Sequence, residues 1–229
     1  MCLKSYTITA MPPKNILRNN VRKHLLKKIL DGDLKVGKTL NLAQLSRDLG
    51  ISVTPIREAL SQLEQARIIR AIPNRGFIVP ELSYEEARDI YDTIAQLEVI
   101  AVENSEFKRS TIHALRQEQL HLQQTHTAEA RLNSRITFHH LLVQDCSNKI
   151  LLSILEDLEA RVLFYEQLFI TNSSFYEQID NQNESIIQAL EEDNVPTAAL
   201  ILKMNWMNIF EHIRHKLILN KTVHHQIIE

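Results

Sequence analysis

The residues with the clearest chemistry lie in the stretch ISVTPIREAL, where two hydroxyl groups and an arginine occur at helical spacing. Proline is tolerated in the first turn of a helix, because the N–H groups of that turn have no intrahelical partner. With Ser52 as the N-cap, Pro55 becomes the third helical residue. Thr54 and Arg57 then share a face that is distinct from the apolar stripe. The stretch therefore predicts a helix that carries polar donors at its N-terminal end.

Such a helix is suited to reading DNA. A helix that enters the major groove presents its N-terminal residues to base edges, while contacts to phosphates set its register. Arg57 is the expected base reader, because a guanidinium can bond guanine O6 and N7 together for about 1–3 kcal/mol of discrimination. Ser52 and Thr54 can reach phosphates or bases. The alternative for Arg57 is a surface salt bridge, and Arg47 can either contact phosphate or point to solvent.

The neighbouring segments complete a small domain around this helix. Apolar residues at helical spacing predict a first helix that starts near residue 15 and ends at Gly32. A second helix lies between Asn41, a suitable N-cap, and Gly50, a suitable stop. Short apolar runs on both sides of residues 73–76 predict a hairpin. Three helices followed by a two-stranded ribbon predict a winged helix-turn-helix domain over residues 1–80.

The remaining chain, residues 81–229, has the periodicity of an all-helical bundle. Its boundary follows from Pro80, from Ser83 and from the acidic cluster that opens the next helix. We expect about six helices, so that the protein as a whole is mainly α. Their expected ranges are 83–105, 110–125, 127–146, 148–170, 176–193 and 196–219.

Charge is divided unevenly between these two parts. Residues 1–80 carry 14 Lys and Arg against 5 Asp and Glu, while the remainder carries 12 against 23. Chance clustering is the alternative, but a basic module joined to an acidic one indicates that the first meets a polyanion. No apolar run reaches the roughly 18 residues of a membrane span, and the start is not a convincing signal peptide. Cys2 and Cys146 make no disulfide framework, so we expect a cytoplasmic protein without membrane contact.

The first 80 residues resemble the GntR family of bacterial transcription regulators. The resemblance rests on the run KKILDGDLKVGKTLNLAQLSRDLGISVTPIREALSQLEQARIIRAIPNRGFIV. The helical remainder is similar to the FCD effector domain of the FadR branch, through the patterns YDTIAQLE, FHHLLVQDCSNKILLSIL and IIQALEEDN. The resemblance implies a homodimeric transcription factor that binds palindromic double-stranded DNA and responds to a small-molecule effector.

Two features of the DNA-binding part follow from the resemblance. It implies that Arg75 and Gly76 lie at the tip of the wing and approach the minor groove or the backbone. The family usually has arginine at the position of Val53. An isopropyl group cannot donate to guanine but can pack on a thymine methyl, so the site sequence of relatives does not carry over.

The effector domain departs further from the family pattern. Many FCD domains bind a divalent metal through an Asp four residues before a His, together with two later histidines. Here these positions hold Arg135, His139, Asn183 and Asn205, so that only the histidine is retained. Guanidinium has no lone pair for a metal and carries its own positive charge. We therefore expect no metal and no other cofactor.

We expect instead that this pocket holds an anionic effector directly. Arg135 and His139 are one turn apart on one face, and Asn183 and Asn205 are expected to offer amides from the opposite side. A guanidinium fork favours bidentate pairing with carboxylate or phosphate. The alternatives are that Arg135 points to solvent or pairs with a nearby Glu, and that His139 is a hydrogen-bonded core histidine.

Two other functions are compatible with parts of the sequence. A metal-dependent hydrolase or oxygenase would need several convergent His and carboxylate ligands, whereas the close histidine pairs point to different faces or lie near the chain end. We therefore do not expect an enzyme. An architectural DNA-binding protein with a purely structural helical half would share the DNA-binding features and lack only the response to a ligand.

Overall fold

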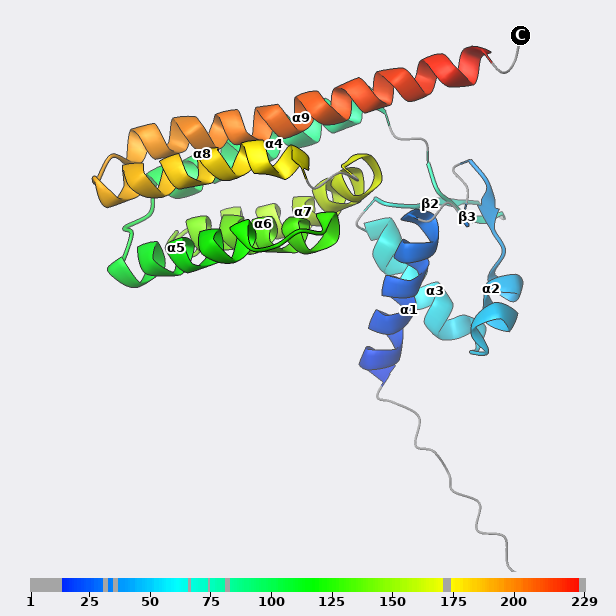
Figure 1. Cartoon of the computed structure of the whole chain (residues 1–229). Helices are drawn as coiled ribbons and strands as arrows, with labels where there is room; N and C mark the ends of the chain where they lie inside the picture. The colour runs from blue at the N-terminus through cyan, green and yellow to red at the C-terminus, as the bar shows by residue number, and fades with distance from the viewer. Residues whose placement is uncertain are drawn as a thin grey trace, which may run out of the picture. The chain divides into compact units, whose positions relative to one another are not determined.

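The computed structural model describes residues 14–226, except 31–32, 35–36, 66, 74, 81–82 and 171–173. The chain forms two compact units, one ending at residue 81 and the other beginning at residue 82 (Figure 1). The expectations for Cys2 and for a helix end at Gly32 fall outside the described residues.

The first unit contains the predicted three helices and wing. Its elements are α1 (Lys14–Leu30), β1 (Thr39–Leu40), α2 (Leu42–Leu49), α3 (Val53–Gln65), β2 (Arg70–Ile72) and β3 (Gly76–Ile78). Both α1 and α2 pack against α3. The side chains that form this core are apolar and almost fully buried: Val21, Leu25, Ile29, Leu45, Ile56, Leu60 and Leu63.

Local rules define the turn between α2 and α3. The side chain of Asn41 accepts a hydrogen bond from the backbone N–H of Gln44 at 3.0 Å, which confirms the predicted N-cap. Gly50 ends α2 with a φ of +64°, in the left-handed region that side chains with a Cβ disfavour. The hydroxyl of Ser46 donates to the carbonyl of Ile51 at 2.5 Å and closes the turn. The direction of α3 is therefore set by short-range contacts.

The wing differs from the prediction in one respect. Its sheet has three antiparallel strands in the order β1-β3-β2, because Thr39 and Leu40 pair with Ile78 and Phe77. A strand of two residues is too short to show alternation in a sequence, so only two strands were predicted. The carboxylate of Glu64 accepts from the N–H of Ala71 at 2.9 Å, which ties the wing to α3.

The second unit consists of six helices over its described residues, as the periodicity predicted. They are α4 (Tyr84–Glu103), α5 (Arg109–Gln123), α6 (Ala128–Val143), α7 (Lys149–Phe169), α8 (Ser174–Glu191) and α9 (Val195–Gln226). Ser83 caps α4 by accepting from the N–H of Glu86 at 2.9 Å. Figure 1 shows α4, α8 and α9 side by side, and α9 packs against both of the others. Helix α5 packs on α6 and α8, and α7 packs on α4.

The core of this unit combines aromatic and charged side chains. Tyr91 lies 6.0 Å from both Trp206 and Phe210, measured between ring centroids. Cys146 is a buried free thiol. Arg135 and Glu166 are also buried, although both are ionisable. Within the described ranges, none of the helices has the length and apolar character of a membrane span.

Candidate nucleic-acid interface and ligand cavity

The N-terminal end of α3 presents the predicted DNA-contacting residues to solvent. Ser52, Thr54 and Arg57 are exposed, and Val53 is 36% exposed. The opposite face of the helix is buried through Ile56, Ala59, Leu60 and Leu63. The apolar stripe thus orients the polar face outward, as the spacing predicted.

Arg57 and the wing border the same groove. This groove, of about 750 Å³, is lined by Arg57 from α3, by Arg75 and Gly76 at the start of β3, and by the segment from Thr39 to Ala43. The backbone N–H of Arg75 donates to the carbonyl of Ile72 at 3.0 Å, and Gly76 has a φ of +89°. The structure therefore brings the predicted base reader and the predicted wing residues together, while Arg47 and residues 52–54 lie outside the lining.

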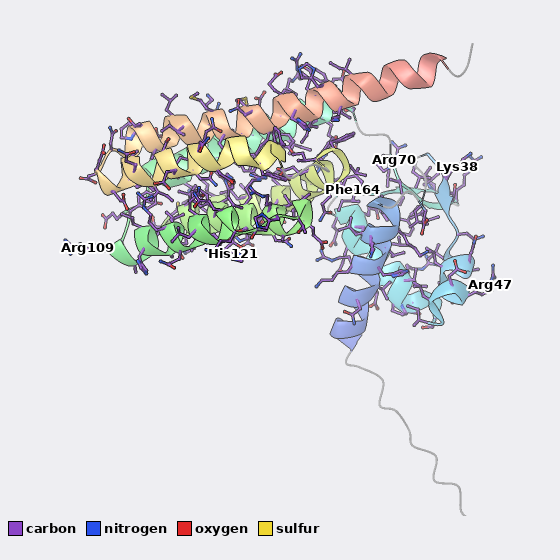
Figure 2. The ribbon with its side chains drawn as sticks, in the orientation of Figure 1. Lys38, Arg47, Arg70, Arg109, His121 and Phe164 are labelled. Atoms are coloured by element: carbon purple, nitrogen blue, oxygen red, sulfur yellow. The ribbon has the colours of Figure 1, made fainter. Side chains whose placement is uncertain are left out.

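Three basic side chains that the sequence singled out are available to a partner. Arg47, Arg57 and Arg75 are exposed, and none of them forms a salt bridge with a described carboxylate. The salt-bridge alternative for Arg57 is thus not found among those residues. Lys38 and Arg70 are exposed as well and were not singled out from the sequence (Figure 2). The only feature of the sequence that pointed to Lys38 and Arg70 was the excess of basic residues in residues 1–80.

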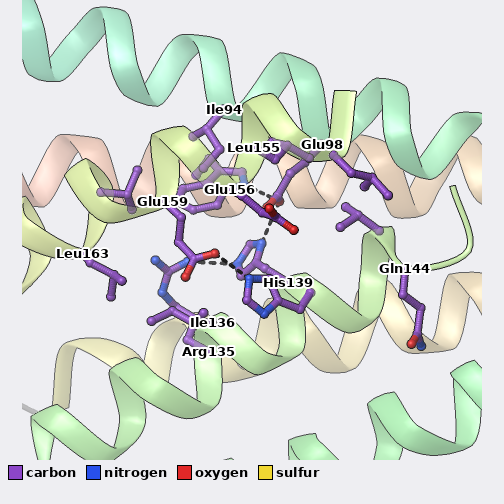
Figure 3. A pocket seen from close by; sticks show the side chains of 15 residues that line it. Ile94, Glu98, Arg135, Ile136, His139, Gln144, Leu155, Glu156, Glu159 and Leu163 are labelled. Carbon is purple, nitrogen blue, oxygen red and sulfur yellow. Dashed lines mark hydrogen bonds and ion pairs between the residues drawn. The ribbon is translucent and has the colours of Figure 1, made fainter. Parts of the chain in front are cut away.

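A cavity of about 240 Å³ lies in the second unit between α4, α6, α7 and α9 (Figure 3). Much of its wall is apolar, including Ile94, Leu155 and Val162. The remaining lining side chains are polar or aromatic: Glu98, Arg135, His139, His140, Gln144, Glu156, Glu159 and Trp206. This mixture of apolar wall and a few polar groups is typical of small-molecule sites.

Arg135 lines the cavity but is already paired. Its Nε donates to Glu166 Oε2 at 3.1 Å, and its Nη2 donates to Glu166 Oε1. Its Nη1 donates to His139 Nε2 at 2.9 Å, and its guanidinium carbon lies 4.7 Å from the centre of the Trp206 ring. The side chain is 2% exposed. The guanidinium group of Arg135, which we expected to be free to bind an anionic ligand, is therefore paired with Glu166. This outcome matches the alternative that Arg135 pairs with a nearby Glu.

His139 is held as a neutral imidazole. Guanidinium only donates, so His139 Nε2 must accept from Arg135 and the ring proton must sit on Nδ1. Nδ1 lies 2.7 Å from Glu98 Oε2, to which it donates. Burial lowers the pKa of His139, in agreement with the neutral form. Trp206 Nε1 also donates to Glu98 Oε2, at 2.6 Å.

His140, the next residue, is in the opposite environment. It lies at the edge of the cavity with its side chain 57% exposed, and its Nε2 contacts the carboxylate of Glu159. This hydrogen bond raises the pKa of His140. Two adjacent histidines therefore have pKa values displaced in opposite directions.

The two asparagines expected at the pocket form a separate pair. Asn205 Nδ2 donates to Asn183 Oδ1 at 3.2 Å, and both residues are fully buried. Neither lines the cavity. The structure thus groups the four expected residues as Arg135 with His139 and Asn183 with Asn205. Sequence reasoning missed Glu98, Glu166 and Trp206 as their partners.

These residues do not fit a divalent metal. At the positions that the resemblance assigned to metal ligands, Arg135 brings a positive charge and both nitrogens of His139 are engaged in hydrogen bonds. Asn183 and Asn205 bond each other. No group of three or more His, Cys, Asp or Glu suited to holding a metal occurs in the part of the chain that the structure describes.

A winged helix-turn-helix with exposed arginines that form no salt bridge with a described carboxylate, joined to a helical unit that contains a cavity, is the architecture expected of two-domain transcription regulators. A family model described as bacterial regulatory proteins of the gntR family matches residues 17–79, and the FCD domain model matches residues 80–206. The chain therefore belongs to the GntR family of bacterial transcription regulators, with an FCD domain as its second unit.

Individual relatives agree with this assignment. The HTH-type transcriptional regulator YdhC of Bacillus subtilis is 29% identical over 201 residues, which cover 84% of this chain and 89% of YdhC. The structure of Escherichia coli McbR has a TM-score of 0.69 at 22% identity, covering 90% of this chain and 99% of McbR. The structure of Lar, described as controlling expression of the Listeria monocytogenes agr system, has a TM-score of 0.65 at 19% identity. The match covers 90% of this chain and 98% of Lar. The two structures show the likeness of fold.

Substitutions of Arg135 and Glu166, which form a buried ion pair, should have strongly non-additive effects on the free energy of unfolding. Removing one partner leaves an uncompensated buried charge, so Arg135→Met or Glu166→Met should each lower the free energy of unfolding by about 3–5 kcal/mol. The double variant should lose much less than the sum, because neither charge is then left alone. Urea unfolding measures all three values. The exposed pair Arg214–Glu211 offers the matched control, whose single replacements should each cost less than about 1 kcal/mol. Additive losses at Arg135 and Glu166 would contradict the pairing.

The two histidines should give opposite pH dependences of stability. Because the folded-state pKa of His139 is lowered, protonation favours the unfolded chain, and stability should fall as the pH drops below about 6.5. Because the folded-state pKa of His140 is raised, its contribution is present below about pH 6.5 and is lost as the pH rises through the folded pKa. Denaturation across this range should show that His139→Gln flattens the acid loss and that His140→Gln steepens it. Identical slopes for both variants would contradict the assigned protonation states.

Proposed function

We propose that this chain is a ligand-responsive transcription regulator that binds a palindromic operator as a homodimer. The observation that carries the proposal is the exposed Arg57, unpaired among the described residues, on a groove shared with Arg75 and Gly76 of the wing. Arg57 reads a guanine, and Ser52 and Thr54 contact phosphates or base edges. Val53 offers the apolar surface that a thymine methyl requires.

The proposed dimer follows from the size of the reading surface. One recognition helix reads few base pairs, and two copies on half-sites about 34 Å apart supply a longer site. The basic charge of residues 1–80 supplies the salt-dependent, sequence-independent part of the affinity. A DNA-binding regulator of a bacterium acts in the cytoplasm, where the DNA lies.

The second unit is proposed to sense a small molecule and to have no catalytic role. The cavity with its polar groups favours this function over that of an architectural DNA-binding protein, which has no need of a ligand site. We also propose that the domain works without a metal, because the residues at the family's ligand positions do not suit one. The relatives are named as transcriptional regulators, in agreement with a protein that is not an enzyme.

Selection of DNA by the purified protein tests the core of the proposal. Fragments recovered from a randomised duplex library should share two inverted half-sites, because a symmetric dimer reads the same sequence twice. Analytical ultracentrifugation on the selected duplex should then give two chains per site. A single chain per duplex, or an enriched sequence without inverted symmetry, would contradict the dimeric mode of binding.

Arg57→Ala should weaken binding to the selected site by about 1–3 kcal/mol, or roughly 5- to 150-fold, and flatten the preference at one position in each half-site. Lys23→Ala on α1 is the control, because a phosphate contact should affect all sequences equally and reduce the salt dependence. Fluorescence anisotropy on the selected duplex and on single-base variants separates the two effects. Unchanged affinity and base preference for Arg57→Ala would rule out this docking mode.

A further inference from the structure

The wall of the cavity carries more negative than positive charge. Glu98, Glu156 and Glu159 line it, whereas Arg135 is neutralised by Glu166 and His139 is neutral. The remaining basic group is His140, which is hydrogen-bonded to Glu159. A ligand in this space therefore meets an excess of carboxylate, the opposite of what the sequence alone suggested.

Glu98 supplies the second and more specific observation. Its Oε2 accepts from His139 and from Trp206, but no described residue donates a hydrogen bond to its Oε1. The side chain is 6% exposed and lines the cavity. A carboxylate oxygen that accepts no hydrogen bond from the protein can accept one from a molecule in the cavity. Glu98 Oε1 is therefore the acceptor that the cavity wall offers to a ligand with a proton to donate.

We propose that the cavity binds a small protonated amine, whose ammonium group donates to Glu98 Oε1 and whose apolar part lies against Ile94 and Leu155. The proposal rests on the proposed ligand-responsive function and defines the chemical class of its ligand. A volume of about 240 Å³ limits the ligand to a compact molecule. Glu156 and Glu159 add attraction for a cation from their places on the same wall.

The test compares three probes of nearly equal shape, benzylamine, benzyl alcohol and benzoate, on the full-length protein after treatment with EDTA. Calorimetry and thermal unfolding should show binding and stabilisation by benzylamine, weaker effects of benzyl alcohol and none of benzoate. This comparison uses the unaltered chain, so it does not depend on the folding of a variant. Tighter binding of benzoate, or equal binding of all three, would overturn the proposal, as would no binding of benzylamine at millimolar concentration.

A pair of substitutions on α4 then locates the amine. Glu98→Gln keeps the shape of the side chain and removes its charge, so benzylamine should bind roughly 10- to 150-fold more weakly. Glu103→Gln, exposed on the same helix, should leave benzylamine binding unchanged. Equal affinity of Glu98→Gln and the unaltered protein would remove Glu98 as the partner.

Operator binding, measured in parallel, separates this inference from the proposed function. Operator binding without any preference for the amine would overturn the ligand class and leave the DNA-binding function standing. Amine binding through Glu98 that leaves operator affinity unchanged would support the ligand class and contradict ligand-responsive regulation.

Discussion

Helix α6 places two guanidinium groups, one turn apart, inside the core of the second unit. Arg131 and Arg135 are 4% and 1% exposed, respectively. A buried charge must be paired, because its loss of hydration otherwise costs several kcal/mol. Asp180 of α8 pairs with Arg131 at 2.7 Å, and Glu166 of α7 pairs with Arg135. These two pairs tie α6 to α7 and α8, and Arg135 also forms part of the cavity wall.

The features that could be predicted from the sequence depend on short-range rules. Asn41, Gly50 and Ser83 each begin or end a helix through contacts with residues three or four positions away. The candidate DNA interface was predictable for the same reason, since Ser52, Thr54 and Arg57 lie within six residues of one another at the start of one helix. Their exposure follows directly from the apolar stripe on the other face.

The cavity could not be predicted in this way, because its polar groups come from four different helices. Glu166 is 31 residues from Arg135, and Glu98 is 41 residues from His139. Neither glutamate differs, in its local pattern, from a solvent-facing residue of an amphipathic helix. The positions of Asn183 and Asn205 were inferred from the family, and the amides bond each other instead of lining the cavity.

His139 accepts a hydrogen bond on one side and donates one on the other, and this order of donors and acceptors determines which ligand charge is compatible with the cavity. Arg135 donates to His139, which donates in turn to Glu98. A carboxylate ligand nearby would raise the pKa of His139 and favour the imidazolium, whose Nε2 would then present a proton to the donating guanidinium. A cation beside Glu98 instead favours the neutral imidazole that this chain of bonds requires. The network therefore ends in an acceptor at the cavity wall, and its most compatible ligand is one that arrives with a proton to donate.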